Sequence, residues 1–135
     1  MDVKGLRIGN LIQIKTSKSI IMSEVKALDI TKDECLINNE SPIIYEPIPL
    51  AKVWLVNFGF VLVKPKEGID EDTGLPYYID RYKLKHASGM YIVVEIYDNE
   101  LAVYINGAKH FISILYVHQL QNLYYILTGE ELTIK

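Results

Sequence analysis

Four consecutive strand-forming segments in residues 77–115 constrain the fold of this chain more than any other feature. The segments are YYIDRYKLKH (77–86), MYIVVEIYD (90–98), ELAVYING (100–107) and AKHFISIL (108–115). Short turn sequences join them, and Asn106-Gly107 is the strongest short signal for a type I′ hairpin turn. Strands joined by such short turns pair antiparallel. The run therefore predicts a meander of antiparallel strands.

The residues before this run carry weaker signals for further strands. Strand-like or extended segments are LRIGNLIQIK (6–15), EVKALDI (24–30), ECLIN (34–38), IIYEPI (43–48) and FVLVK (60–64). Gly9-Asn10 predicts a bend or bulge inside the first of them. A short turn between the second and the third predicts a hairpin over residues 24–38.

One short helix and one long loop interrupt the strand pattern. In residues 49–60, Pro49 occupies a first helical position and Gly59 follows the last turn, which predicts a helix of about two to three turns. The longest predicted loop is residues 65–76, which hold two glycines, two prolines and four acidic side chains. This loop precedes the meander.

Residues 116–132, YVHQLQNLYYILTGEEL, predict a C-terminal helix that ends at Gly129. One face is an apolar stripe of Tyr116, Leu120, Leu123 and Leu127, with Val117 and Tyr124 beside them, wide enough to dock on a sheet. The other face carries His118, Gln121, Asn122 and Tyr125. Ile126 also turns toward this second face. The simplest interpretation is a core helix with partly exposed amides. The sharper hypothesis makes the second face an interface, within a homo-oligomer or beside a binding groove.

The order of these elements predicts an α+β fold. We expect an antiparallel, β-rich meander or small barrel-like sheet, a short middle helix, and a C-terminal helix packed on the sheet. A chain of 135 residues favours a single domain spanning residues 1–135. Half of the residues are hydrophobic and 23% are charged, a composition typical of globular rather than disordered chains.

The net charge and the cysteine content limit the classes of partner and the cellular compartment that fit this sequence. The net charge of −3 argues against a protein that binds duplex nucleic acid, which usually has a basic face and a high isoelectric point. Cys35 is the one cysteine, so no disulfide can form within the chain, which fits a reducing compartment. The longest apolar runs are far shorter than the roughly 20 residues of a membrane-spanning helix. We therefore expect a cytoplasmic protein without a membrane partner.

The sequence carries no motif of a common enzyme or metal site. It has no GxGxxG, GxxxxGK[ST] or GxSxG pattern. His86, His110 and His118 do not have metal-ligand spacing, and the acidic residues 70–72 lack the remaining ligands of a calcium loop. We therefore expect no catalytic residue, cofactor or metal. A dyad of Cys35 with a histidine is the least supported alternative.

Arg81, Lys83 and Lys85 form a basic strip, because alternate residues of a strand share one face. A solvated face that blocks unwanted strand pairing explains the strip most simply. The functional hypothesis is a phosphate-binding strip for a small anionic ligand. Tyr82, His86 and His110 complete the candidate ligand-binding residues. The chain is also rich in tyrosine, with ten against three phenylalanines and one tryptophan, which fits both strands and binding surfaces.

Three stretches resemble a family of small proteins, without an assigned activity, from Bacteroidota phages and prophages. They are LRIGNLIQ (6–13), IIYEPIPLAKVWLVNFGF (43–60) and ILYVHQLQNLYYILTGEEL (114–132). Members are similar in a RIGNLV start, a PIPLTEEWLLKFGF middle and a YVHQLQNLYFALTGEEL end. The middle departs here, because LAKVWLVNF replaces an acidic turn, and residues 61–113 match only as a strand pattern. The resemblance implies a phage setting inside a bacterial cell and no mechanism.

Together these observations predict a binding protein rather than an enzyme. We expect a homo-oligomer that antagonises host defence, either by sequestering a small anionic ligand such as a nucleotide immune signal or by blocking a host protein. The alternative is a structural or assembly component of the virion.

Overall fold

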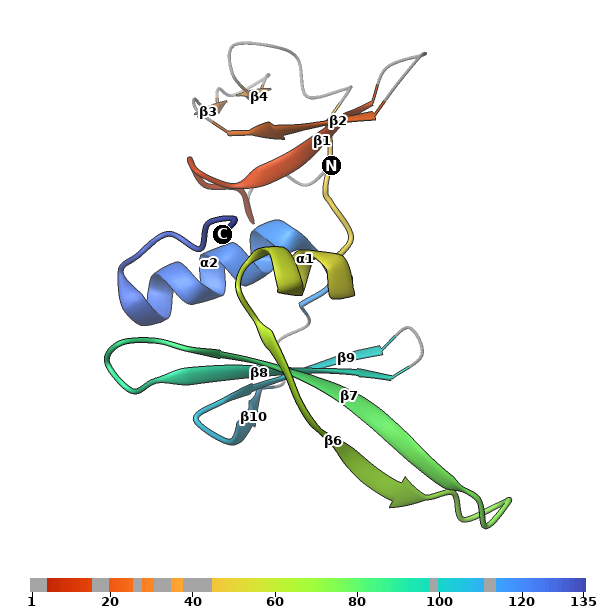
Figure 1. The fold of residues 1–135 in the computed structure, drawn as a ribbon. Coiled ribbons are helices and arrows are strands. Elements are labelled where there is room, and N and C mark those ends of the chain that lie inside the picture. The colour runs from red at the N-terminus through yellow and green to blue at the C-terminus, as the bar shows by residue number, and fades with distance from the viewer. Residues whose placement is uncertain are drawn as a thin grey trace. The chain divides into compact units, whose positions relative to one another are not determined.

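The computed structural model describes residues 5–15, 20–25, 28–30, 35–37, 45–97, 100–110 and 114–135 (Figure 1). These residues form ten antiparallel strands in three sheets, together with two helices, so the predicted α+β class is confirmed. The chain divides into two compact units. The first contains residues 1–50 and 115–132, and the second contains residues 51–114 and 133–135. One domain can hold two such units, so the single domain predicted for residues 1–135 stays a prediction.

The first unit combines a three-stranded sheet, a two-stranded hairpin and the C-terminal helix. Its elements are β1 (Leu11–Lys15), β2 (Ile20–Glu24), β3 (Leu28–Ile30), β4 (Cys35–Ile37), β5 (Tyr45–Glu46) and α2 (Val117–Thr128). Strand β1 lies between β2 and β5, and β3 pairs with β4 as the predicted hairpin. Strand β2 was not predicted. The predicted bend is at Gly9, whose φ is +98°, and it precedes β1 rather than interrupting it.

The second unit contains the predicted meander. Its elements are α1 (Lys52–Asn57), β6 (Val61–Ile69), β7 (Pro76–Lys85), β8 (Tyr91–Tyr97), β9 (Glu100–Ile105) and β10 (Ala108–His110). The sheet order is β10-β9-β8-β7-β6, so consecutive strands are neighbours and the sheet stays open rather than closing into a barrel. Asn106 and Gly107 both have positive φ, +50° and +85°, as a type I′ turn requires.

Strand β6 is longer than predicted, and the loop after it is correspondingly shorter. The strand continues through Pro65 to Ile69, which leaves residues 70–75 as the turn. A bulge sets Lys64 and Pro65 opposite Asp80 alone. Proline is tolerated there because β6 is an edge strand, where a missing N–H costs no pairing, and because bulges interrupt the ladder anyway.

Helix α1 begins later than predicted, because the residues around Pro49 belong to an extended segment. Pro49 forms an isolated bridge with Tyr116, and the neighbouring Leu50 N–H donates to the Leu115 carbonyl at 2.9 Å. Pro49 is therefore not the first helical residue; Ala51 is the N-cap. The predicted end is confirmed, because Gly59 follows the helix with a φ of +93°.

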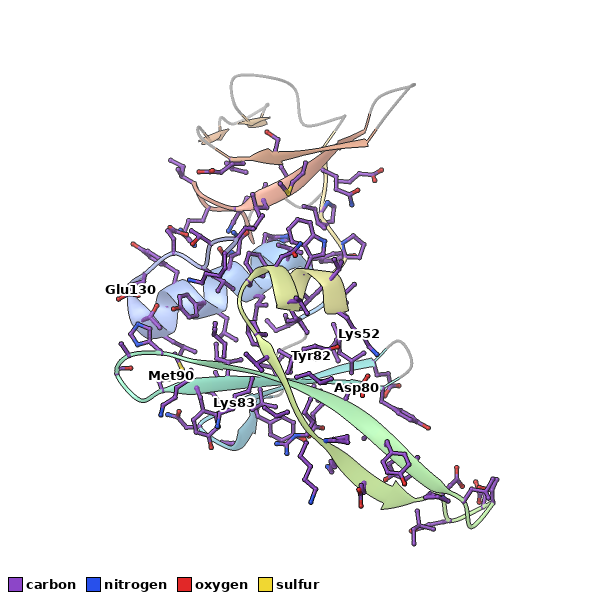
Figure 2. All side chains as sticks on the ribbon, in the orientation of Figure 1. Lys52, Asp80, Tyr82, Lys83, Met90 and Glu130 are labelled. Atoms are coloured by element: carbon purple, nitrogen blue, oxygen red, sulfur yellow. The ribbon has the colours of Figure 1, made fainter. Side chains whose placement is uncertain are left out.

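Most of the core of the second unit lies on one face of its sheet, together with α1, and on the other face Val93 and Glu95 are also buried. Buried residues of β7, β8 and β9 on this face are Tyr82, Ile92, Val94, Val103 and Ile105. Helix α1 is tied to the same face, because Lys52 Nζ donates to Asp80 Oδ2 at 2.6 Å (Figure 2). The hydrogen bond and the charge of Asp80 raise the pKa of Lys52 above its ordinary value. We call this surface of the sheet the core face.

Candidate functional site

The basic strip lies on the opposite surface of the sheet from the core face. Arg81, Lys83 and Lys85 alternate with Tyr82 along β7, and Figure 2 shows Tyr82 and Lys83 on opposite sides of the strand. Tyr82 is only 7% exposed and belongs to the core. Tyr82 therefore does not lie on the same surface as the three cations, and its prediction as a ligand-binding residue is wrong. We call the surface of Arg81, Lys83, Lys85 and the side chains flanking them on β8 and β9 the basic face.

The strand register brings tyrosines to this face. Lys85 is paired with Tyr91, Lys83 with Val93, and Val93 in turn with Tyr104. Directly paired residues project from the same side of a sheet. By the same alternation, Tyr77 on β7 and Tyr97 on β8 also project there. Four of the ten tyrosines thus share the basic face: Tyr77, Tyr91, Tyr97 and Tyr104.

Lys83 and Tyr91 form a cation–π pair on the basic face. The Lys83 Nζ lies 4.5 Å from the centre of the Tyr91 ring. The backbone of Tyr91 is fixed by reciprocal bonds: its N–H donates to Asn106 Oδ1, and the Asn106 N–H donates to its carbonyl, both at 3.0 Å. A lysine held over a ring by cation–π attraction keeps its N–H groups available for an anion. The pair thus places a positive charge over one side of a flat ring.

Arg81 is oriented by a buried carboxylate. Its Nε lies 3.4 Å from Glu95 Oε1, and the Glu95 side chain is only 8% exposed, against 36% for Arg81. The Arg81 charge compensates the carboxylate, which would be costly to bury alone. Among the residues that the structure describes, no hydrogen bond engages the two terminal nitrogens of Arg81. Those nitrogens form the part of the guanidinium fork that binds phosphate oxygens.

A second aromatic group lies farther along the same face. The Tyr77 and Tyr97 rings are 5.8 Å apart at an interplanar angle of 52°, and Tyr97 is 45% exposed. Tyr77 packs directly on the backbone of Gly68, since a Cβ added there would lie 2.3 Å from the Tyr77 ring. Glycine at position 68 therefore makes room for the ring.

The histidines proposed as ligand-binding residues do not converge. His86 belongs to the turn after β7, where its Nδ1 lies 2.8 Å from Ser88 Oγ and accepts from the Ser88 N–H at 3.1 Å. His110 ends β10, and β8 and β9 lie between β10 and β7, a separation of about 14 Å at the usual strand spacing. The side chains of His110 and Cys35 lie outside the described part of the chain. No three His, Cys, Asp or Glu residues gather as a metal site within the residues described.

The amides predicted to form an interface on α2 bind the chain's own N-terminal segment. Gln121 Oε1 accepts from the Leu11 N–H at 2.8 Å, and its Nε2 donates to the carbonyls of Gly9 and Leu132 at 3.4 and 3.3 Å. Asn122 is bonded in the same way; its partners are the Asn10 side chain at 2.8 Å and the Gly5 carbonyl at 2.6 Å. We call these contacts of α2 with residues 5–11 the N-terminal clamp.

Arg7 extends the clamp to the end of the helix. Its guanidinium lies 4.1 Å from the centre of the Tyr125 ring, and it forms a two-pronged ion pair with Glu131. His118 is 6% exposed and Gln121 2%, so these two are enclosed by the chain itself. An intermolecular role for this face stays a prediction, and the surface that remains for it is on Asn122 and Tyr125. Sequence reasoning missed the clamp because its two sides lie 110 or more residues apart.

The apolar stripe of α2 is rotated from the predicted one. The buried residues are Val117, His118, Leu120, Gln121 and Tyr124. Val117, Leu120 and Tyr124 are common to the predicted and the observed stripe. Leu127 is 39% exposed and Ile126 78%. The predicted stripe is therefore wrong at Leu127, and the packed face includes the buried amide of Gln121, which was predicted to lie on the other face. Ile126 is exposed, whereas His118 and Gln121, with which it was predicted to share a face, are buried.

No protein-family model, curated protein or solved structure significantly matches this chain. Membership of the phage family that the sequence resembles therefore stays a prediction. In the part of the chain that the structure describes, neither helix is long and apolar enough to cross a membrane.

Proposed function

We propose that this chain is a small non-enzymatic binding protein whose basic face takes a nucleotide-type ligand. The observation that carries the proposal is the Lys83–Tyr91 pair on the same sheet face as the terminal nitrogens of Arg81, which make no hydrogen bond with the described residues. A nucleotide presents both complementary groups, a phosphate for the cations and a flat base for the ring. Lys85 is exposed and is paired with Tyr91 across the two strands, so it adds a further cation for the phosphate.

The biological role that we propose combines this face with the resemblance to phage proteins. Sequestering a nucleotide signal would deprive a host defence of its trigger, and it requires affinity but no catalysis. The other form of the hypothesis, in which the protein blocks a host protein, uses the same face for an acidic surface of that protein.

A thermal-shift series against cyclic and linear nucleotides tests the proposed binding. A nucleotide present at about 100 times its Kd should stabilise the fold by about 2.7 kcal/mol. The shift should shrink in Lys83→Gln and Lys85→Gln variants and persist in Lys64→Gln, which removes an exposed lysine from the edge-strand bulge. Unchanged melting with every nucleotide would contradict ligand binding.

A plating assay tests the proposed role. Phage growth on a host with a nucleotide-signalling defence should rise when the wild-type chain is expressed, and should not rise with the Lys83→Gln, Lys85→Gln double variant. Equal growth with the wild type and with an empty vector would exclude the anti-defence role and leave nucleotide binding to be judged by the thermal shifts.

The hairpin of β6 and β7 favours a second candidate function, assembly into the virion. Strand β8 pairs with β7 only from Asp80 onward, so residues 76–79 pair with β6 alone and the hairpin projects from the sheet (Figure 1). Its apolar side chains are exposed: Ile69 by 70%, Leu75 by 64% and Tyr78 by 58%. A two-stranded ribbon is marginally stable in water and gains from being covered. Mass spectrometry of purified virions decides this candidate, since absence of the chain from them would exclude it.

A further inference from the structure

The basic face carries two aromatic stations at opposite ends of β8. The first station is Tyr91 with Lys83 over its ring, and the second is Tyr97 with Tyr77 beside it. Tyr91 and Tyr97 are six residues apart on the same side of one strand, which separates them by about 20 Å. Arg81 and its partner Glu95 lie between the stations.

The distance between the stations selects the length of the ligand. A mononucleotide has one base and can stack at only one station. A nucleic acid strand advances about 3.4 Å per nucleotide when its bases are stacked, and farther when it is stretched. Four nucleotides make three steps, so they span both stations when the strand is stretched to about 6.7 Å per step, close to the spacing of the cations along β7. Four nucleotides lie at the lower end of the site sizes of single-strand binding folds.

The cations that can bind phosphates lie at the Tyr91 end of the line between the two stations. Arg81, Lys83 and Lys85 recur about every 6.8 Å along β7, a row of cations that can follow a phosphate backbone. Glu95 is buried and neutralises only its partner Arg81. At the other end, Glu100 is paired with Tyr97, so the second station provides stacking rather than phosphate contacts.

The chemistry of the rings distinguishes single strands from duplexes. Tyrosine stacks on an unpaired base, whereas a duplex covers the faces of its bases and would meet only the cations. We propose that the basic face binds a single-stranded oligonucleotide of about four nucleotides, with bases on the Tyr91 and Tyr97 stations and phosphates along Arg81, Lys83 and Lys85. This inference rests on the proposed function and specifies its ligand.

Fluorescence anisotropy with labelled oligothymidylate and oligouridylate of one, two, four and eight nucleotides tests the length. Affinity should rise steeply up to about four nucleotides and then level off. The logarithm of the binding constant should fall with the logarithm of the salt concentration with a slope of about −2, as three cations on a single strand predict. A duplex of the same length should bind more weakly.

Variants of the second station test whether the oligonucleotide reaches Tyr97. Tyr97→Leu should weaken tetranucleotide binding about tenfold and leave mononucleotide binding unchanged, because only the longer ligand reaches this station. Tyr97→Phe keeps the ring and should keep the affinity. Tyr78→Leu is the matched control, since Tyr78 is an exposed tyrosine on the other side of β7.

The outcomes separate this inference from the proposed function. Mononucleotides that bind as tightly as tetranucleotides would overturn the oligonucleotide and leave the nucleotide face standing. Equal affinity for a duplex would also overturn it, because charge alone would then explain binding. Failure of every nucleotide, of any length, would overturn both. If Tyr97→Leu unfolds the chain, the wild-type length series and the Tyr97→Phe variant decide whether the oligonucleotide inference holds.

Discussion

At the scale of single residues, Gln121 contributes most clearly to stability, because its amide binds three backbone groups in two separate segments of the first unit. Replacing it by leucine removes bonds to the Leu11 N–H, the Gly9 carbonyl and the Leu132 carbonyl. Groups that lose their partner in a buried site cost about 1–3 kcal/mol. We expect Gln121→Leu to lower the free energy of unfolding by about 2–3 kcal/mol in urea denaturation.

Asn57→Leu is the matched control for this change. Asn57 is an exposed amide at the end of α1, and its side chain makes no hydrogen bond among the residues described. Its replacement should change the unfolding free energy by less than about 0.5 kcal/mol. Similar losses in the two variants would show that replacing a helical amide by leucine is costly in either helix, and the clamp would lose its assigned role.

Tyr124 makes the stability of the fold depend on pH in the alkaline range. Burial, and then the nearby Glu130 carboxylate, raise the pKa of Tyr124 in the folded chain above its ordinary value of 10.0. The unfolded chain therefore loses this proton first, and stability falls as pH rises from about 10 through the folded pKa. Below pH 10 both states keep the proton and the effect is absent. In urea titrations from pH 7 to 11, Tyr124→Phe should lose less stability than the wild type above pH 10. A constant difference across that range would contradict the shift.

At the scale of elements, the β6–β7 hairpin depends on the fit of Tyr77 against Gly68. A methyl group at position 68 would lie 2.3 Å from the ring, so Gly68→Ala must displace it. We expect this change to cost about 1–3 kcal/mol in thermal unfolding, the usual range for overpacking. The Gly68→Ala, Tyr77→Ala double variant should cost less than the sum of the single changes, because the clash is absent. Strict additivity would contradict the contact.

The elements that the sequence predicts correctly are those with local signals. The strands of the meander and the Asn106-Gly107 turn follow from neighbouring residues, and Gly129 ends α2 as predicted. Two of the errors share a physical origin, because the effect of a proline depends on its tertiary setting. Pro65 does not break β6, because an edge strand with a bulge needs no N–H there, and Pro49 lies in an extended segment paired with distant residues.

The part of the candidate site that depends on local sequence was also predictable. Alternation within β7 places Arg81, Lys83 and Lys85 on one face from the sequence alone. Their aromatic and acidic neighbours on β8 depend on the register between two strands, which the hairpin sequence does not specify. The Tyr91 and Glu95 contacts therefore required the structure.

At the scale of the whole molecule, the exposed end of α2 carries the prediction of a homo-oligomer. Tyr125, Ile126 and Leu127 are consecutive and are 41, 78 and 39% exposed, an apolar surface that a second copy of the chain can cover. Light scattering over a range of concentrations should give a mass that rises above the 15.5 kDa of one chain.

Ile126→Asp should keep the chain monomeric at every concentration, because burying an unpaired carboxylate in an apolar interface is costly. Leu75→Asp is the control, since it places the same charge at an exposed leucine on the β6–β7 hairpin, outside the unit that contains α2. A wild-type chain that stays at the monomer mass at its highest concentration would refute the homo-oligomer. Dissociation by Leu75→Asp and not by Ile126→Asp would move the interface from α2 to the hairpin, where it would favour the assembly function over nucleotide sequestration.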